Sequence, residues 1–442
     1  MNIAKQRIRY IISDLIATAL GWFCFYVYRF DLTAHNDFAT LQDFLLNQNV
    51  LLNLCITPLL WLCLYSLSGY YAKPYFKNQL EELQKTFITV LAGSLIFFFL
   101  YVIDDVPLFD YDSIELSSIN HVPSSVYLQI LLTMIVYVLL PVYICRFLIT
   151  STTNKKIRKG LLTFNTTVIE SPKSASMQRE SGSALPDAFI LEPEVRVPKN
   201  VFRMVYELMP LGRPILIKAD ANDMLSGQVR TSSLTSVPMI EYGSSKLSAF
   251  QNNAKRLFDI IGSLIALIIC SPLLLVIAIM VKQDSEGPVI YRQERLGKCA
   301  RPFTILKFRT MCTDAEKDSP MLSVKGDRRV TRIGRMMRKY RLDELPQLWN
   351  ILVGDMSFVG PRPERKFYVD QIINIAPHYA KLLQVRPGLS SWGMVKYGYA
   401  SDTFQMVERM RYDLMYIDNM SPALDLKIMA YTIKTVVTGK GI

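Results

Sequence analysis

The chain has 442 residues, half of them hydrophobic, and a formal net charge of +12. This length allows two or three structural units, and so high a hydrophobic share is unusual for a soluble protein. Only three histidines are present, which leaves little room for histidine-based catalysis. The seven cysteines show no metal-ligand spacing, so the pattern indicates neither a zinc site nor a disulfide framework.

Four apolar runs fill the first 150 residues of the chain. They cover residues 10–29, 50–71, 86–103 and 126–149. Each is long enough to cross a bilayer as a helix, since about 20 residues are needed. No small-residue cleavage site follows the first run, so we expect a retained anchor rather than a signal peptide.

Charges in the connecting loops predict how these helices are oriented. Residues 30–49 and 104–125 contain several acidic side chains and no Lys or Arg. Basic residues lie instead at the N-terminus, in the loop 72–85 and directly after the fourth run. Because positive residues stay on the cytoplasmic side, both ends of this bundle are expected to face the cytoplasm.

Residues 152–250 differ in composition from the apolar bundle. Short β-like runs at 187–191 and 214–218 flank a helical pattern at 199–209, and Ser-rich stretches such as 225–237 surround them. We expect a small α/β domain with linkers. It carries no Gly-rich phosphate fingerprint, so no cofactor is assigned to it.

A fifth apolar run covers residues 257–281 and has basic residues on both flanks. A full crossing would place the basic C-terminal third outside the cell, against the positive-inside bias. Pro272 removes an intrahelical hydrogen bond, and the Ser271 hydroxyl can satisfy a freed carbonyl. We therefore favour a re-entrant helix that bends at Ser271 and Pro272 over an ordinary kinked spanning helix.

The remaining sequence predicts short strands followed by helices. Strand-like pieces lie at 288–291 and 303–307, a basic amphipathic helix covers 328–340, and a second helix is expected to begin at Asp343. Further amphipathic segments cover 365–384, 403–419 and 422–437. Their apolar faces suit a lipid interface, or they pack the core.

Most of the positive charge lies in the C-terminal third. Residues 282–442 contain 27 Lys and Arg against 17 Asp and Glu. Such a surface suits anionic lipid, nucleotide phosphate or nucleic acid. Nucleic acid is the least supported of these partners, because no nucleic-acid motif is present.

Two adjacent carboxylates, Asp343 and Glu344, precede Pro346. Asp is a favoured helix N-cap and proline a common early-turn residue, so a structural role is one interpretation. The basic residues that favour a chemical role, as candidate substrate-binding groups, are Lys307, Arg309, Arg338, Arg341, Arg362 and Arg386. Carboxylates within such a cluster suit a divalent cation and a diphosphate. A carboxylate can also attack phosphorus and form an acyl phosphate.

Some of these basic residues have a second interpretation. Lys307 and Arg309 could contact lipid phosphates only, and Arg386 could fix the loop before Pro387 instead of binding substrate. Asp259 could pair with Arg256 or a later basic residue.

Several motifs in order make the chain from Lys255 onward resemble the bacterial sugar transferase family, the monotopic phosphoglycosyl transferases. The motifs are Lys255-Arg256 with Asp259, Ser271-Pro272, Gly287-Pro288-Val289, Gln293-Glu294-Arg295, Lys307-Phe308-Arg309-Thr310-Met311, Arg341 to Gln347, Gly360 to Pro363 and Arg386-Pro387-Gly388. Taken whole, the chain is similar to the long polyprenyl-phosphate hexose-1-phosphate transferases. Residues 152–250 are shorter than the nucleotide-fold-like middle domain of those relatives.

The resemblance implies a three-part fold. Residues 1–151 would form a membrane α-helical bundle of four transmembrane helices, and residues 152–250 a small α/β middle domain. Residues 251–442 would form a mainly α monotopic catalytic domain with a re-entrant helix. The implied location is the bacterial inner membrane, multi-pass, with the catalytic domain on the cytoplasmic face. The implied partners are inner-membrane lipid and, as an open alternative, a second copy of the chain in a homodimer. Nucleic acid is not an expected partner.

The resemblance also implies a ping-pong reaction. A hexose 1-phosphate would pass from a UDP-sugar to undecaprenyl phosphate, with UMP released. Asp343 would be the nucleophile, and Glu344 would bind Mg²⁺ or position the pair, so both are candidate metal ligands. The basic residues would neutralise charge on the diphosphate. Such a reaction would initiate exopolysaccharide, capsule or O-antigen synthesis.

Two other functions compete with this one. An ordinary membrane glycosyltransferase would release UDP instead of UMP. A membrane scaffold or regulator for polysaccharide export would not turn over substrate at all. The intact carboxylate pair and its basic neighbours argue against a scaffold, which has no use for them.

Overall fold

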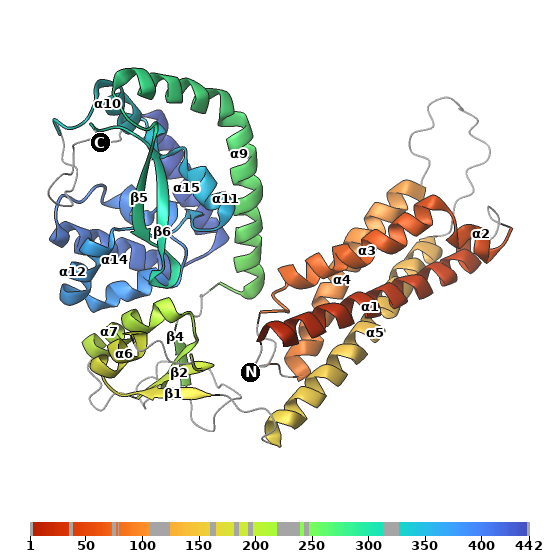
Figure 1. Cartoon of the computed structure of the whole chain (residues 1–442). Helices are drawn as coiled ribbons and strands as arrows, with labels where there is room; N and C mark the ends of the chain where they lie inside the picture. Colours follow the sequence, from red (N-terminus) through yellow and green to blue (C-terminus); the bar gives the residue numbers. More distant parts are fainter. Residues whose placement is uncertain are drawn as a thin grey trace. The chain divides into compact units, whose positions relative to one another are not determined.

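The computed structural model describes residues 3–34, 39–72, 77, 79–105, 124–159, 165–180, 185–192, 198–218, 239–242, 247–312 and 327–439. The chain divides into two compact units, Met1–Thr163 and Phe164–Ile442 (Figure 1). Most of the acidic loop 104–125 and all of the Ser-rich stretch 225–237 lie outside the described residues.

Four long helices make up most of the first unit. They are α1 (Ile3–Arg29), α3 (Gln48–Leu67), α4 (Gln79–Asp105) and α5 (Ser124–Arg158), with the π-helix η1 (Phe30–Ala34) and the short α2 (Leu41–Leu45) after α1. All four apolar runs expected from the sequence are therefore helical. Each contains a stretch long and apolar enough to cross a membrane.

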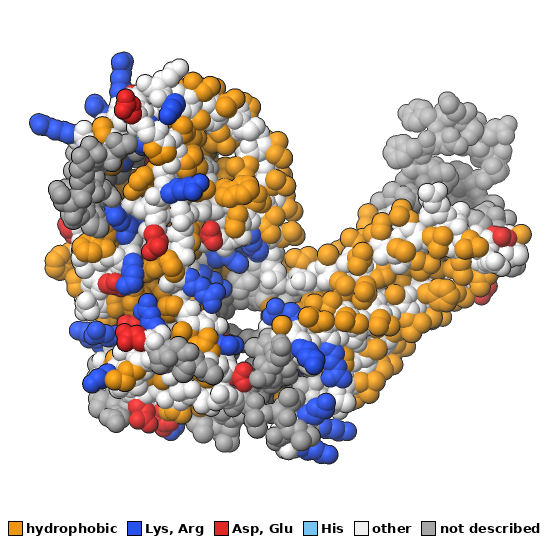
Figure 2. All heavy atoms as spheres, viewed as in Figure 1, with side chains coloured by type: hydrophobic (Ala, Val, Ile, Leu, Met, Phe, Trp, Pro, Cys, Tyr) orange, Lys and Arg blue, Asp and Glu red, His pale blue; other side chains and the backbone are white. Residues whose placement is uncertain are grey.

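Side chains of the first unit are arranged as in a membrane bundle. Leucine and isoleucine point outward, and hydrophobic side chains cover the visible face of these helices (Figure 2). Trp22 and Trp61 are fully buried between the helices. Asp14 and Arg146 also lie inside, joined by an ion pair of 2.7 Å. Charged residues within membrane helices face the interior and pair in this way.

The second unit begins with a four-stranded sheet in the order β1-β2-β3-β4. Its strands are β1 (Thr166–Ile169), β2 (Ala188–Leu191), β3 (Ile215–Lys218) and β4 (Met239–Tyr242), of which the last is antiparallel. Parallel neighbours need a crossover, and helices α6 (Pro172–Glu180) and α7 (Pro198–Leu208) supply two. The β-like runs and the helix predicted in this region are thus confirmed.

Helix α9 (Ala249–Asp284) contains the fifth apolar run. A capping box starts it, because Ser248 accepts from the Gln251 amide and the Gln251 side chain accepts from the Ser248 amide. The helix continues through Pro272, whose ring leaves the Ile268 carbonyl without its amide donor. The Ser271 hydroxyl donates to that carbonyl at 2.8 Å, as the sequence predicts. Figure 1 shows α9 curving around one side of this unit.

The path of α9 relative to a bilayer is a separate question. By length and composition, α9 is one of five helices in the described part of the chain that could cross a membrane. A re-entrant course therefore stays a prediction.

A two-stranded ribbon and three short helices follow α9. The ribbon pairs β5 (Ile290–Leu296) with β6 (Pro302–Phe308) in antiparallel fashion, after which come α10 (Arg332–Lys339), the 3₁₀ turn η4 (Leu342–Glu344) and α11 (Gln347–Val353). The α-helix expected to begin at Asp343 in fact begins at Gln347. Arg341 adopts φ 55°, a left-handed conformation, so the chain makes a separate tight turn before Pro346 can start the helix.

The rest of the second unit is mostly helical. Its elements are β7 (Ser357–Val359), α12 (Lys366–Ile375), the 3₁₀ segment η5 (Pro377–Gln384), β8 (Gly388–Ser390), α13 (Trp392–Lys396), α14 (Thr403–Asp418) and α15 (Pro422–Val437). Strands β7 and β8 pair in parallel. A 3₁₀ turn, η3 (Lys298–Ala300), joins β5 to β6.

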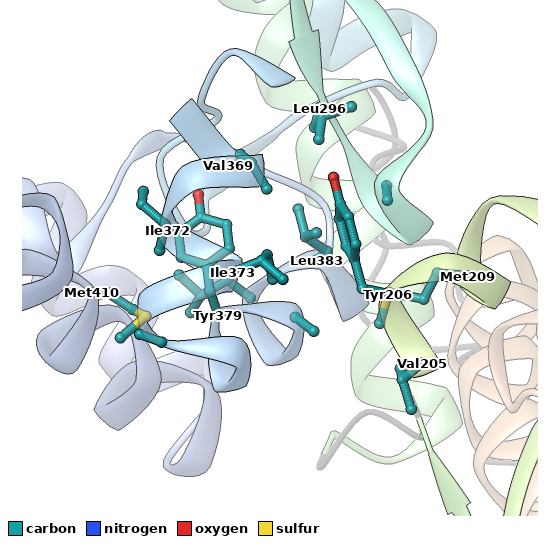
Figure 3. Packing of buried hydrophobic residues seen from close by; sticks show 14 of the residues in the cluster. Val205, Tyr206, Met209, Leu296, Val369, Ile372, Ile373, Tyr379, Leu383 and Met410 are labelled. Carbon is teal, nitrogen blue, oxygen red and sulfur yellow. The ribbon is translucent and has the colours of Figure 1, made fainter. Parts of the chain in front are cut away.

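One hydrophobic core joins the sheet region to the C-terminal helices. Tyr206 and Met209 from α7 and η2 (Met209–Leu211) pack with Ile373 and Leu383 from α12 and η5 (Figure 3). The Tyr206 hydroxyl also donates to Asp370 at 2.7 Å. The predicted segments 365–384 and 403–419 therefore pack the core. Helix α15 differs, because it keeps large apolar side chains such as Leu426, Ile433 and Val437 exposed.

Candidate active site

The carboxylate pair sits in a tight turn between two helices. Arg341 precedes it in the left-handed conformation and Pro346 follows as the N-cap of α11. Both carboxylates are buried, with 9% of Asp343 and 6% of Glu344 exposed. The turn therefore holds two acidic side chains in the interior, where a charge needs a partner.

Three cations surround the Glu344 carboxylate. The shortest N···O distances are 3.3 Å from Lys307 of β6, 3.6 Å from Arg362 and 3.7 Å from Arg341. Burial alone would raise the pKa of Glu344, but the three positive charges outweigh it and lower that pKa to about 2. Glu344 is therefore ionised and fixed in place.

Asp343 has a different environment from its neighbour. In the described part of the chain, no basic side chain lies within 4.0 Å of its carboxylate. Burial and the Glu344 charge raise the pKa of Asp343, and the more distant Lys307 and Arg338 offset this only in part. The pair is thus unequal, because one carboxylate is held by cations and the other is left available.

Helix α10 places Arg338 beside this pair. Thr331 caps the helix by accepting from the Gly334 amide at 3.0 Å. Gly334 packs on the Thr310 backbone so closely that a Cβ would lie 2.3 Å from its carbonyl oxygen. The Arg338 Nε then donates to the Thr310 hydroxyl at 2.9 Å. The guanidinium is positioned by the residues that follow β6.

Tyr399 also belongs to this cluster, although it is part of no motif in the sequence. Its ring centroid lies 5.4 Å from the guanidinium carbons of both Arg341 and Arg362, within the range of a cation–π interaction. Burial and the negative charge of Glu344 raise the pKa of its phenol. A tyrosine in a loop after α13 has no local pattern that could have linked it to the pair.

Arg309 lies away from the carboxylates. Its guanidinium donates to the Ser285 carbonyl at 2.5 Å, to the Ser285 hydroxyl at 3.0 Å and to the Val281 carbonyl at 3.3 Å. It also donates to the Pro288 carbonyl. These acceptors lie in the last turn of α9 and in the segment directly after it, so the structure gives Arg309 a role at the end of that helix and does not bring it to the pair.

Arg386 also lies outside the cluster. Its Nε donates to the Gly354 carbonyl at 2.9 Å, which corresponds to the loop-fixing alternative. Asp259 accepts from the Ser357 hydroxyl at 3.1 Å and the Phe358 amide at 3.0 Å, so its hydrogen bonds join α9 to β7. Of the six basic candidates, the structure groups Lys307, Arg338, Arg341 and Arg362 around the carboxylates.

Asp343 and Glu344 are the two protein carboxylates that could hold Mg²⁺ at this site. Among the residues that the structure describes, no group of three or more His, Cys, Asp or Glu side chains is suited to a metal ion. Mg²⁺ is commonly held by one or two carboxylates together with substrate phosphates. Asp343 and Glu344 fit that shared arrangement, while a site built from protein groups alone is not found there.

The chain combines helices long and apolar enough to cross a membrane with a buried carboxylate that three cations surround, which is typical of membrane-associated proteins that bind phosphate groups. Residues 250–439 match the family described as bacterial sugar transferase. The chain is 37% identical over 199 residues to the exopolysaccharide production protein PSS of Rhizobium leguminosarum bv. phaseoli, covering 42% of this chain and 97% of that protein. The chain belongs to the bacterial sugar transferase family.

Two longer relatives have names that state an activity. One, a UDP-N-acetylgalactosamine-undecaprenyl-phosphate N-acetylgalactosaminephosphotransferase of Aeromonas hydrophila, is 41% identical over 228 residues, 52% of this chain and 53% of that protein. Another, a UDP-glucose:undecaprenyl-phosphate glucose-1-phosphate transferase of Klebsiella pneumoniae, is 35% identical over 263 residues, 59% of this chain and 57% of that protein. The match thus spans about half the length of these two relatives.

Proposed function

We propose that the protein transfers a hexose 1-phosphate from a UDP-sugar to undecaprenyl phosphate and releases UMP. The names of the relatives supply the substrate class. The observation that carries the proposal is the unequal pair: three cations hold Glu344, while no cation of the described residues lies within 4.0 Å of Asp343. A nucleophile needs an unshared electron pair, and a carboxylate bound by two or three cations is a poor one.

In the first half-reaction the ionised Asp343 attacks the sugar-bearing phosphorus of the donor. An oxygen–phosphorus bond to Asp343 forms, the bridging bond of the diphosphate breaks, and its electron pair leaves on UMP. Lys307, Arg341 and Arg362 provide positive charge where the diphosphate charge builds up. Glu344 keeps these cations oriented before the substrate arrives.

In the second half-reaction a phosphate oxygen of undecaprenyl phosphate attacks the same phosphorus. The bond to Asp343 breaks, its electrons return to the carboxylate, and the product is undecaprenyl-diphosphate-sugar. Because Asp343 is regenerated, the enzyme turns over without a further reactant.

Mg²⁺ belongs to this proposal as the cofactor, with Asp343 and Glu344 as its protein ligands. When bound, it would supply a Lewis acid that neutralises phosphate oxygens. The Glu344 carboxylate, with its pKa near 2, would remain an ionised ligand at all working pH values.

The same proposal places the protein in the bacterial inner membrane with its second unit on the cytoplasmic face. Helix α9 would enter the inner leaflet, bend at Ser271 and Pro272 and return. Its exposed apolar side chains, such as Ile268 and Ile269, support contact with lipid. The product would start an exopolysaccharide, capsule or O-antigen chain.

A leaving-group assay tests the proposal. Purified full-length protein is incubated with undecaprenyl phosphate and a panel of UDP-sugars, and nucleotides are separated by chromatography. We expect UMP from at least one donor. Release of UDP would instead identify a glycosyltransferase, and no nucleotide release from any donor by purified protein shown to be folded would favour a scaffold.

A further inference from the structure

A cavity of about 180 Å³ lies at the N-terminal end of α9. Its wall includes Lys255, Arg256 and Asp259 of α9, Lys298 of η3 and Arg386 before β8. None of the residues that line it pairs with Glu344. The cavity is therefore a second polar site, built from different elements than the carboxylate pair.

Positive charge in this cavity exceeds negative charge. Four lining side chains are cationic, and Asp259 already accepts two hydrogen bonds from β7. Lys255 is balanced by Asp425 at 2.5 Å. Arg256, Lys298 and Arg386 have no carboxylate partner within 4.0 Å in the described part of the chain. Asp259 is the one carboxylate among the lining residues, so positive charge stays in excess there and an added anion would offset it.

The two arginines are held in place by backbone carbonyls. Arg256 donates from its two Nη atoms to Ile351 and Leu352 at 2.6 and 2.8 Å, at the end of α11. Arg386 uses its Nε on Gly354 at 2.9 Å. Within the described residues, its two Nη atoms have no hydrogen-bond acceptor.

The Lys298 ammonium group is a second hydrogen-bond donor without an acceptor among the described residues, after the Arg386 guanidinium. It makes no hydrogen bond or ion pair from its ammonium group within the described residues, and its side chain reaches solvent. Loss of surrounding water and the neighbouring Arg386 guanidinium lower the pKa of Lys298. The two cations are therefore near enough to repel, and a shared anion would relieve that repulsion.

Phosphate is the anion that matches these donors. A fixed guanidinium with two free N–H groups binds two oxygens of one phosphate, and a lysine adds a point charge. The volume is large enough for a phosphate or a diphosphate. A neutral sugar would leave the charges unbalanced.

The apolar surface of α9 indicates where such a phosphate would come from. Directly after Lys255 and Arg256, the side chains of Leu257, Phe258 and Ile261 are exposed by 43%, 51% and 49%. These side chains lie on the side of the helix turned away from Lys255, Arg256 and Asp259. An apolar face of this kind suits a bilayer, whose headgroup phosphates would then lie at the end of α9 that carries the cavity. We propose that this cavity binds the phosphate of an anionic membrane lipid, separately from the transfer reaction at Asp343.

Lipid retention on the full-length protein tests this proposal. The protein is reconstituted in nanodiscs of phosphatidylcholine with or without phosphatidylglycerol, and bound lipid is counted by native mass spectrometry. In a second arm, inorganic phosphate and pyrophosphate are titrated into phosphatidylcholine discs and followed by the thermal unfolding midpoint. The variants are Lys298→Gln and Arg386→Gln, with Lys427→Gln as the matched control, because Lys427 is exposed on α15 and does not line the cavity.

We expect tight retention of phosphatidylglycerol by the wild type and by Lys427→Gln, and about tenfold weaker retention by Lys298→Gln, since a charge-assisted hydrogen bond contributes roughly that factor. Asp343→Asn should retain lipid normally, which separates this site from the proposed transfer activity. Binding of pyrophosphate that depends on Lys298, without lipid retention, would overturn the lipid assignment and identify a soluble phosphate ligand at the same cations.

Equal lipid retention in Lys298→Gln, Arg386→Gln and Lys427→Gln, with no phosphate effect on any unfolding midpoint, would overturn the proposal. Lys298 is open to solvent, so its variant should fold even if Arg386→Gln does not.

Discussion

Two regions of the molecule bury charged side chains, and they do so in opposite ways. In the first unit, Arg146 donates twice to Asp14 at 2.9 and 2.7 Å and once to Thr86 at 2.8 Å. In the second unit, three cations converge on Glu344, while Asp343 has none within 4.0 Å among the described residues. The first arrangement is balanced and the second is not. A buried ion pair by itself therefore does not indicate a catalytic site. A buried cluster in which one carboxylate has no cationic partner does.

Removing the available carboxylate should have the largest effect. Asp343→Asn keeps the shape of the side chain and removes the nucleophile, so we expect turnover to fall by about a thousandfold or more. UMP release measures this directly. The unfolding midpoint should not fall, because Asp343 makes no ion pair in the described part of the chain. Turnover near that of the wild type would refute the assignment.

Disrupting the ion pair between Asp14 and Arg146 should lower stability and leave activity unchanged. Arg146→Met leaves Asp14 buried and unpaired, which we expect to cost about 3–5 kcal/mol of stability. The double variant Asp14→Leu with Arg146→Met should recover most of that loss. Thermal unfolding in detergent measures both. Transfer activity per folded molecule should be unchanged, and a specific loss of activity in the stable double variant would show that the bundle has a chemical role.

Replacing Glu344 tests whether the two carboxylates have different roles. Glu344→Gln frees Lys307, Arg341 and Arg362 from their common partner, so we expect turnover to fall by about a hundredfold. Titrating the cofactor in the same variant tests the metal assignment, since Mg²⁺ dependence should shift to higher concentration. A rate unaffected by chelators in the wild type would exclude Mg²⁺.

The unequal pair also predicts a pH effect. Burial and Glu344 raise the pKa of Asp343, so below that pKa the nucleophile is protonated and the rate of adduct formation should rise as pH increases through it. In Glu344→Gln the repelling charge is absent, and this rise should move to lower pH. Single-turnover rates against pH in both proteins test the sign. A shift to higher pH would contradict the electrostatic description.

Tyr399 should contribute the smallest effect of this series. Its ring contacts Arg341 and Arg362, an interaction of about 0.5–2 kcal/mol. We therefore expect Tyr399→Ala to lower kcat/KM by about tenfold, and Tyr399→Phe, which keeps the ring face, to change it by less than about threefold. If both variants lose activity equally, the hydroxyl rather than the ring is the functional group.

Local patterns in the sequence predict some of these features well. Hydrophobic runs of helical length identify all four helices of the bundle, and the Ser271-Pro272 sequence predicts the hydroxyl-to-carbonyl bond that the structure contains. Asp343, Glu344 and their neighbouring arginines follow one another along the chain, so their clustering is visible before folding. Charge and hydropathy are local properties, and these predictions use nothing else.

Other features depend on contacts that no local pattern encodes. Arg309 is basic like its neighbour Lys307, yet it turns to the end of α9, while Lys307 reaches Glu344. The left-handed Arg341 delays the helix to Gln347, because a backbone φ of 55° is set by tertiary packing rather than by residue type. Tyr399 enters the cluster from a loop far along the chain. Which basic residues meet the carboxylates is decided by the fold.

Mass spectrometry of the quenched enzyme tests the central claim most directly. Full-length protein is mixed with a UDP-sugar that supports UMP release, in the absence of undecaprenyl phosphate, quenched and digested. We expect one hexose phosphate on the peptide that contains Asp343, absent from Asp343→Asn and removed when the lipid acceptor is added. A peptide that stays unmodified while UMP forms only in the presence of acceptor would show that the sugar phosphate passes directly from donor to lipid.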